Sequence, residues 1–450
     1  MKLNIYKILF FTVMIAMLVS CEVEEFSDLN GPEVSAFEDE ITRGDLQDLI
    51  GGILYSSRLR LGTYYDDCGV IGREYWRFSG SDPRFTTDLL GGGNSVLDNN
   101  TFYITGPWAA RYRTVKNANL ILGFFDTQDL SAQFSTSEID ATIGLLRTFI
   151  AYELLLNLNL TNDGGIRLDV ADENNLGPFV SKSVALTGIR AILDAGAGNL
   201  GNGGGAFPFV LTSGFSGFDT PSSFLKANRA ISARVAAYQG DASSVLNYLN
   251  SSFFSLNGSD LNTGIYYNFS EDQTDIINPL FISIGGTSAA QARIVQPLFI
   301  TDAEGGDNRL DKVAQLSEPV TLDGLTGDYI VNRYLSNSDD IPIIRNEELI
   351  LLYAEANITK NSAEAVIALN IIRNSAGLGD YSGATDTESL INEMLNQRRY
   401  SLYAEGHRWI DMRRYNKLDE LPIDRPPNPE VPDDGDNVWI QFPIPLTENQ

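Results

Sequence analysis

The helical signal is strongest in one stretch of the sequence, Ile341-Pro342-Ile343-Ile344-Arg345-Asn346-Glu347-Glu348-Leu349-Ile350-Leu351-Leu352-Tyr353-Ala354-Glu355-Ala356. Four residues in it stand at i, i+3, i+4 and i+7, which is the spacing of one apolar helix face: Leu349, Leu352, Tyr353 and Ala356. After Asn361-Ser362 the same spacing returns in Ala365, Ala368, Leu369 and Ile372. The two runs predict antiparallel helices joined by a tight turn. Their alanines allow a close approach, as in tetratricopeptide pairs.

Similar helix pairs are expected on both sides of this stretch, although the strict 34-residue tetratricopeptide signature is absent. The sequence therefore predicts an all-α superhelix of degenerate tetratricopeptide-like pairs, with long loop-rich insertions and a few short strands. Helices are expected near 45–61, 108–125, 137–160, 222–256, 345–375 and 388–416. Insertions are expected at 62–107, 161–221, 257–344 and 417–441, where glycine, proline or polar residues interrupt the pattern. Strand-like runs are Phe281 to Ile284 and Ile330-Val331.

The composition excludes several classes of function. The 450 residues contain 32 Lys and Arg against 59 Asp and Glu, a net charge of −27, which repels nucleic acid. The single histidine, His407, rules out a metal site with two histidine ligands in this chain. It is expected to be a packing residue. Acidic turns at Asp302 to Asp307 and Asp433 to Asp436 lack the spacing of an EF-hand loop, so solvated turns are expected and no metal or cofactor is predicted.

The N-terminus predicts export and lipidation. Residues 1–20 place two lysines before an apolar run of about a dozen residues, too short to span a bilayer. Leu18-Val19-Ser20-Cys21 matches a bacterial lipobox, which makes Cys21 the lipidation site; the alternative is an ordinary signal peptide with a chance cysteine. Residues 21–40 would form an acidic tether and 41–450 a single domain. Cys68 would then be alone, with no disulfide.

Several motifs together resemble the SusD/RagB family of nutrient-uptake lipoproteins. They occur in a consistent order, beginning with Trp108, Tyr112 and Asn119 and continuing with the stretch quoted above. They then run through Leu369 to Arg373, Ala376-Gly377-Leu378, Gln397-Arg398-Arg399, Glu405-Gly406-His407-Arg408-Trp409-Ile410-Asp411-Met412-Arg413-Arg414-Tyr415 and Phe442-Pro443-Ile444-Pro445. The sequence departs from the family pattern at Gln397, Ser401 and Ala404. Residues 160–340 match nothing in the family pattern.

The resemblance implies a non-catalytic protein of the cell outer membrane. Such a protein would bind an oligosaccharide or polysaccharide, cap a SusC-like TonB-dependent transporter and pass the ligand to it. The acidic start, Glu22, Glu24 and Glu25, resembles a Bacteroidetes surface-export signal, whereas a merely solvated tether is the alternative. Two other function classes stay open. They are a glycoside hydrolase that uses a carboxylate pair, and a structural lid without affinity for a ligand.

Two further expectations concern particular side chains. Arg408 stands one turn from Glu405 and from Asp411, and Arg414 stands three after Asp411, so these pairs would tie the last two helices together. A sugar platform is expected where aromatic rings alternate with charged side chains in the first insertion. Its candidate residues are Tyr65, Tyr75, Trp76, Arg77, Phe78 and Arg84. The alternative is that these rings attach the loop to the helical core.

Overall fold

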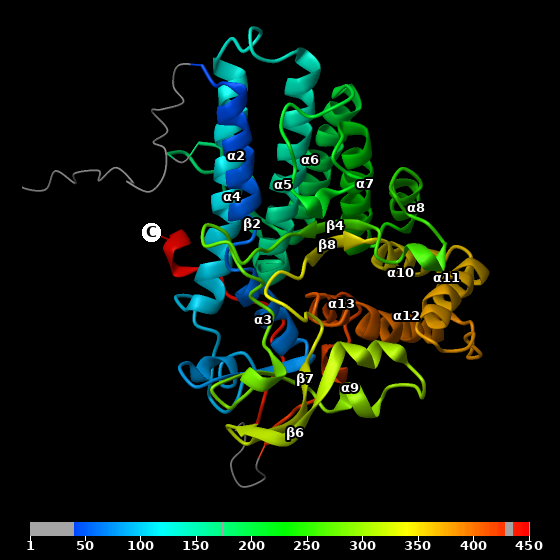
Figure 1. The fold of residues 1–450 in the computed structure, drawn as a ribbon. Helices are drawn as coiled ribbons and strands as arrows, with labels where there is room; N and C mark the ends of the chain where they lie inside the picture. Colours follow the sequence, from blue (N-terminus) through cyan, green and yellow to red (C-terminus); the bar gives the residue numbers. More distant parts are fainter. Residues whose placement is uncertain (1–39, 173, 428–434, 450) are drawn as a thin grey trace, which may run out of the picture. The chain divides into compact units, whose positions relative to one another are not determined.

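The computed structural model describes residues 40–172, 174–427 and 435–449. The predicted signal segment 1–20, Cys21 and nearly all of the tether lie outside the described residues. Residues from Thr42 onward form one compact unit (Figure 1). Cys68 is a free, buried thiol. Within the described ranges, none of the helices combines the length and the apolar character that crossing a bilayer requires.

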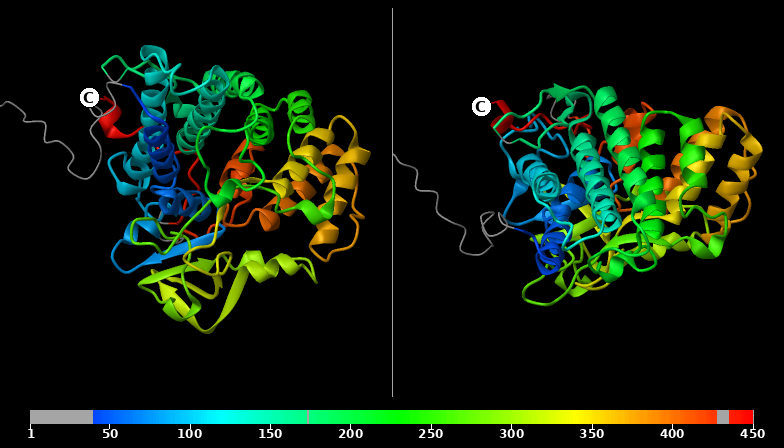
Figure 2. Two further views of the ribbon diagram at one scale, coloured as in Figure 1. Left: turned by 45° about the horizontal axis from the view of Figure 1, so that its top comes forward. Right: turned by 90° about the horizontal axis from the view of Figure 1, so that it is seen from above.

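The first half of this unit is a row of long helices. They are α2 (Arg43–Ser56), α3 (Leu61–Ile71), α4 (Phe102–Thr127), α5 (Thr136–Thr161), α6 (Lys182–Asn202) and α7 (Pro221–Tyr238). Capping boxes start three of them, because hydrogen bonds are exchanged between Thr42 and Asp45, between Ser135 and Glu138, and between Thr220 and Ser223. Figures 1 and 2 show α4, α5, α6 and α7 side by side. The row is longer than the sequence predicted.

Helix α6 corrects the prediction that 161–221 is a continuous loop-rich insertion. Its glycines disfavour a helix in a free peptide, but here Gly196 allows α5 and α6 to pack closely. A Cβ at Gly196 would lie 3.2 Å from the carbonyl oxygen of Gly144, and a Cβ at Gly144 would lie 2.8 Å from that of Gly196. The close packing of α5 on α6 therefore offsets the low helix propensity of α6.

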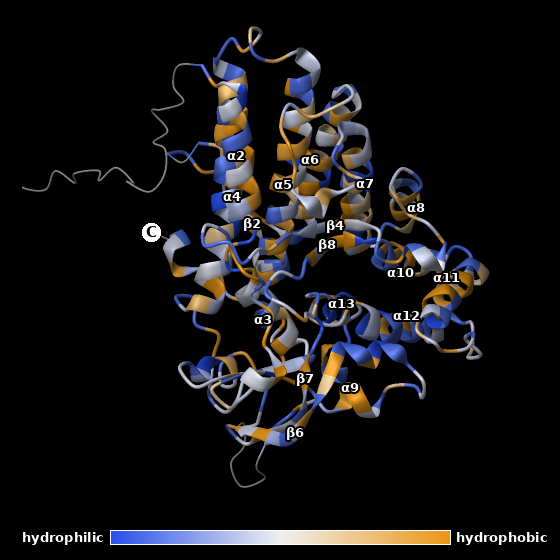
Figure 3. Cartoon of the chain, in the orientation of Figure 1, coloured by the Kyte–Doolittle hydropathy of each residue, from blue (hydrophilic) through white to orange (hydrophobic). Residues whose placement is uncertain are grey.

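The C-terminal helices confirm the pairs predicted from spacing. They are α8 (Ala242–Asn250), α10 (Asn346–Asn357), α11 (Ser362–Ser375), α12 (Thr387–Ser401) and α13 (Arg408–Arg414), with the short α9 (Leu298–Thr301) between α8 and α10. Residues Ile350, Ala354, Ala365 and Leu369 of α10 and α11 are fully buried in one core cluster, to which Leu390 of α12 also belongs. Figure 3 shows apolar residues along α5 and polar residues along much of α12.

The insertions form a small sheet and two strand pairs. The sheet is antiparallel with the order β1 (Tyr75–Ser79), β5 (Gln291–Val295), β7 (Leu325–Val331) and β6 (Val313–Leu322). The pairs are β2 (Ile166–Arg167) with β3 (Phe179–Val180), and β4 (Gly264–Tyr267) with β8 (Ile341–Arg345). Ile330-Val331 is a strand as predicted, whereas Phe281 to Ile284 is not, because Ile284–Gly286 forms a 3-10 turn.

Short 3-10 turns link these elements. They are η2 (Pro83–Phe85), η3 (Asn162–Gly164), η4 (Ser213–Phe215), η5 (Gly258–Asp260), η6 (Ile284–Gly286), η7 (Asn308–Lys312), η8 (Leu418–Glu420) and η9 (Leu446–Asn449).

Buried ion pairs join the last helices, but only one is among those predicted. Arg414 lies 3.1 Å from Asp411, as the i, i+3 spacing predicted. Among the described residues, Arg408 forms an ion pair with neither Glu405 nor Asp411, and its Nη1 donates to the Leu395 carbonyl at 3.4 Å. Its place is taken by Arg398, whose Nε is 2.6 Å from Asp411, and by Arg345, which holds Glu405. The network thus ties α13 to α12, and β8 to the connection between α12 and α13, across more of the chain than local spacing can indicate.

Candidate ligand-binding site

The predicted aromatic platform lies mostly inside the protein. Tyr75 and Phe78 are fully buried, and Tyr65 and Trp76 each retain 4% exposure. The Trp76 and Phe78 rings stack at 6.2 Å. The structure gives these four rings the positions of packing residues, with little surface for a sugar to cover. A ligand role for this set stays a prediction.

Contacts from distant parts of the chain bury the loop. The Trp76 indole Nε1 donates to Asp424 at 2.8 Å. Asp66 accepts two hydrogen bonds from Arg293, at 2.7 and 2.9 Å, and lies 3.4 Å from the Arg77 Nε. Since β1 also pairs with β5, the first insertion is held against the third insertion and the C-terminal segment. These contacts agree with the alternative prediction, in which the aromatic rings attach the loop to the helical core.

Two arginines of the predicted set reach the surface. Arg84 is the more exposed and forms a bidentate pair with Asp82, at 2.7 and 2.9 Å. Its guanidinium lies over Phe102 at 5.0 Å, and Arg77 lies over Phe85 at 5.4 Å. Both cations are already engaged by neighbours in this segment.

An open hollow lies where α5 ends, α6 begins and α7 ends, and we call it the α6 hollow. Its volume of about 560 Å³ is within the range of small-molecule sites. It is lined by Asp163, Ser181, Lys182, Ser183, Leu186, Tyr238 and Gln239. The lining offers a carboxylate, an ammonium group, two hydroxyls and an amide around one aromatic ring. Hydroxyl-rich ligands need this combination of hydrogen-bonding groups beside an apolar ring.

Neighbouring contacts fix the groups that line the α6 hollow. The Lys182 ammonium donates to Asn162 at 2.7 Å, and burial lowers its pKa. Gln239 accepts from Arg190 at 3.2 Å. The Tyr238 ring packs on the Arg414 guanidinium, 4.9 Å from the ring centre, and remains partly exposed. The site is therefore preorganised, which lowers the entropy cost of binding.

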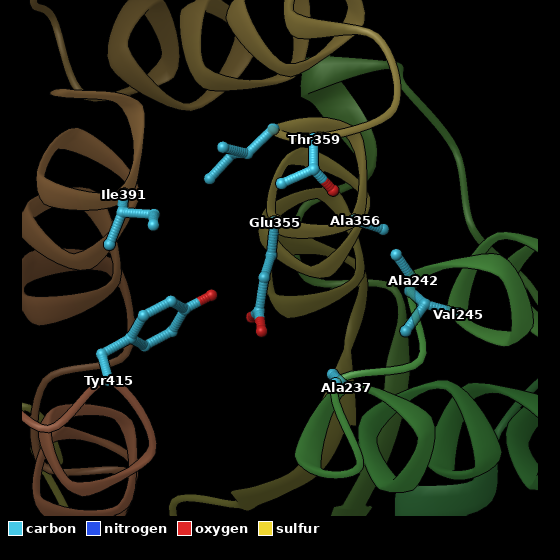
Figure 4. Close-up of a pocket in the computed structure, with 10 residues that line it drawn as sticks. Ala237, Ala242, Val245, Glu355, Ala356, Thr359, Ile391 and Tyr415 are labelled. Carbon is cyan, nitrogen blue, oxygen red and sulfur yellow. The ribbon is translucent and has the colours of Figure 1, made fainter. Parts of the chain in front are cut away.

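A second pocket lies on the other side of the α7–α8 turn. It has a volume of about 170 Å³. Figure 4 shows the Glu355 carboxylate and the Tyr415 hydroxyl directed into it, among apolar side chains that include Ala242, Val245 and Ile391. Glu355 already pairs with Arg414 at 2.7 and 3.1 Å. Because this pocket is smaller, mostly apolar and has its charge paired, it suits a hydroxyl-rich ligand less than the α6 hollow.

Sequence reasoning missed the residues of the α6 hollow. Asp163 and Lys182 fell in the segment assigned to a loop, and Tyr238 fell on a helix assigned to packing. The available signal was an aromatic residue two positions before the Gly240-Asp241 turn, since the end of a helix is less covered than its middle. No pattern indicated that three helix ends meet.

The other residues that the sequence analysis singled out have structural roles. His407 is buried, which lowers its pKa to about 4, and its Nε2 lies 3.9 Å from Glu348. Its Nδ1 has no hydrogen-bond partner among the described residues. In the predicted acidic turns, Asp302 pairs with Arg399 and Asp307 with Arg309. No cluster of three potential metal ligands occurs in the part of the chain that the structure describes.

Comparisons with known proteins agree with this architecture. A model of the SusD family matches residues 326–434. The SusD-like protein P38 of Formosa agariphila is 37% identical over 94 residues, which are 18% of this chain and 19% of that protein. Surface glycan-binding protein A from Bacteroides uniformis aligns over 90% of this chain and 97% of its own, with a TM-score of 0.66 and 15% identity.

A further solved structure, the SusD-like carbohydrate binding protein from Bacteroides vulgatus ATCC 8482, covers 91% of this chain and 96% of its own. Its TM-score is 0.65 and its identity 14%. At these identities the likeness concerns the fold, and the SusD-like fold predicted from the sequence is confirmed.

Proposed function

The chain belongs to the SusD family, and we propose that it binds oligosaccharides or polysaccharides at the cell surface and passes them to a TonB-dependent transporter. The α6 hollow is the observation that carries the binding role. Its volume is about 560 Å³, and it places positively and negatively charged hydrogen-bonding groups beside the partly exposed Tyr238. The names of two similar structures, a surface glycan-binding protein and a carbohydrate binding protein, support the same ligand class.

Binding accounts for the site better than hydrolysis does. A glycosidase needs two carboxyl groups roughly 5 to 10 Å apart on either side of the scissile bond. Of the described residues, Asp163 alone supplies a carboxylate to the lining of the α6 hollow. Arg414, which packs on Tyr238, has Glu355 as its nearest carboxylate. Glu355 lines the separate pocket, and Arg414 neutralises its charge. We therefore propose a non-catalytic protein.

Titration of Tyr238→Ala with a panel of neutral oligosaccharides tests the binding site. We expect the association constant for a bound oligosaccharide to fall about tenfold or more, because the ring contact is lost. Tyr55→Ala is the matched control, since Tyr55 is a 42% exposed tyrosine on α2. Gln239→Ala is a second variant that leaves the packing of Tyr238 on Arg414 in place. Unchanged affinity in both site variants, or release of reducing ends by the wild type, would contradict the proposal.

The transporter role rests on the family and on the predicted lipid anchor. A protein held at a membrane only by acyl chains does not carry a ligand across it, so transfer requires a partner that spans the bilayer. Purification of the lipidated protein in mild detergent at low salt should recover one large β-barrel protein. Recovery of this chain alone would favour the alternative of a free surface-binding protein.

A further inference from the structure

We propose that this protein has a second ligand site, which binds a sugar that carries a carboxylate or sulfate group. The site is a hollow of about 290 Å³ beside α4, on which three lining residues follow one helix face: Tyr112, Arg113 and Lys116. Arg167, Val170, Leu176 and Glu448 complete it. We call it the α4 hollow. It shares no lining residue with the α6 hollow.

Charge is the first argument. Three of the seven lining side chains are cationic and one is acidic, in a chain whose net charge is −27. Arg113 is exposed and makes no hydrogen bond or ion pair with another described residue. The acidic member, Glu448, is occupied by Arg167 at 3.1 Å and by the Trp108 indole at 2.8 Å. A concave cationic surface on so acidic a protein attracts an anion selectively.

Preorganisation is the second argument. The Tyr112 hydroxyl donates to the Arg167 carbonyl at 2.9 Å and accepts from the Arg167 amide at 3.0 Å. The Arg167 guanidinium stacks on Phe179 at 4.4 Å and donates to the Gly177 carbonyl at 2.6 Å. This wall is therefore fixed before a ligand arrives, which lowers the entropy cost of binding.

The apolar part of the lining specifies the body of the ligand. Leu176 is 46% exposed, and it lines the hollow with Val170 and the Tyr112 ring. A free inorganic anion has no group to cover these side chains. A sugar ring covers them with its C–H face and places an attached carboxylate or sulfate near Arg113. The sugar identity rests on the proposed function, whereas the anionic group rests on the α4 hollow itself.

Titration with four probes tests the inference: trigalacturonate, a sulfated carrageenan disaccharide, maltotriose and inorganic sulfate. We expect at least one of the two anionic sugars to bind, with an affinity that falls about tenfold or more in Arg113→Ala. Arg113→Lys should restore part of the affinity, because it keeps the charge. Lys226→Ala, which removes an exposed cation on α7, is the matched control and should bind as the wild type does.

Three outcomes would overturn the inference. They are no binding of either anionic sugar, equal binding by Arg113→Ala, and binding of sulfate ion as tight as that of the anionic sugars. Tyr238→Ala separates this test from that of the α6 hollow. If maltotriose or another neutral sugar binds and depends on Tyr238 while the anionic sugars do not bind, the inference fails and the proposed function stands. Binding of the anionic sugars alone, dependent on Arg113, supports the inference and counts against the α6 hollow as the binding site.

Discussion

Arg345 holds Glu405 through two hydrogen bonds, Nη2 to Oε1 at 2.9 Å and Nε to Oε2 at 3.2 Å, across 60 positions of the chain. Both side chains are buried. Burial alone would raise the pKa of Glu405, but the charges of Arg345, Arg333 and Lys312 together outweigh it and lower that pKa. The pair joins the strand that leads into α10 to the connection between α12 and α13.

Glu405→Gln should destabilise the fold by about 3 to 5 kcal/mol, because it leaves the buried Arg345 cation without its full countercharge. The free energy of unfolding in urea measures the effect. Glu388→Gln is the control: Glu388 is 65% exposed and pairs with Lys417 at 3.0 Å, so its loss should cost less than about 1 kcal/mol. Equal losses of unfolding free energy in the two variants would show that the buried pair stabilises the fold no more than the exposed pair does.

Glu74 should make the protein less stable as the pH rises. Burial raises its pKa to about 8 from an ordinary 4.5, although the Ala404 amide donates to it at 3.1 Å. The folded state therefore holds this proton more tightly than the unfolded state does. The associated stability is complete below about pH 4.5 and is lost as the pH rises toward 8.

Glu74→Gln should flatten this part of the pH profile, and the difference from the wild type should reach on the order of a few kcal/mol at pH 8. Unfolding at several pH values between 4.5 and 8.5 measures it. Glu318→Gln, an exposed substitution on β6, should leave the profile unchanged. A Glu74→Gln profile parallel to that of the wild type would mean that Glu74 is ionised in the folded state.

The contact between α5 and α6 predicts opposite effects for two glycine substitutions. Gly144→Ala places a Cβ 2.5 Å from Leu200 Cγ and 2.8 Å from the Gly196 oxygen, so it should cost about 1 to 3 kcal/mol. Gly198→Ala meets nothing within 4 Å and should stabilise α6 by about 0.5 to 1 kcal/mol. Melting temperatures of the two variants check the prediction, and a shift in the same direction would contradict it.

Trp76→Ala distinguishes packing from ligand binding in the first insertion. From its 4% exposure and its hydrogen bond to Asp424, we expect a loss of about 3 to 5 kcal/mol in stability. Arg84→Ala, at the exposed end of the same segment, should change stability by less than about 1 kcal/mol. A Trp76→Ala protein that melts normally but loses oligosaccharide affinity would restore the sugar platform.

Cys21→Ala should release the protein from the outer membrane, because the acyl chains would be missing. Fractionation of cells and surface labelling measure this. Cys68→Ala is the control, since the Cys68 thiol is buried and free. Retention of Cys21→Ala in the outer membrane would refute the lipid anchor.

Local spacing was a sufficient guide where helices pack through regular apolar faces. The α10–α11 pair follows from Leu349, Leu352, Ala365 and Leu369, because each of these side chains is buried and the two helices, which are adjacent in sequence, pack on each other. Helix α6 was missed because its glycines oppose helix formation locally and are compensated by packing against α5 and α7. Tertiary packing therefore determined that this segment is helical.

The candidate site was harder to predict than the fold. The rings of Tyr75 and Trp76 suggested a binding surface, but the groups that bury them are supplied from as far away as Asp424. Tyr238 and Lys182 meet only because α6 and α7 lie side by side. A single sequence does not contain those distances.

The pairing of β1 with β5 makes the folding of the first insertion dependent on chain that is made much later. The Arg77 side chain reaches the carbonyl of Ala292, 215 positions away, and the Trp76 indole reaches Asp424, 348 positions away. Such non-local contacts form slowly. Until β5 has left the ribosome, the edge of β1 has no partner, and until residue 424 has followed, the Trp76 indole has no acceptor. A nascent or truncated chain that ends before β5 therefore exposes an unpaired strand and apolar rings, which favours aggregation.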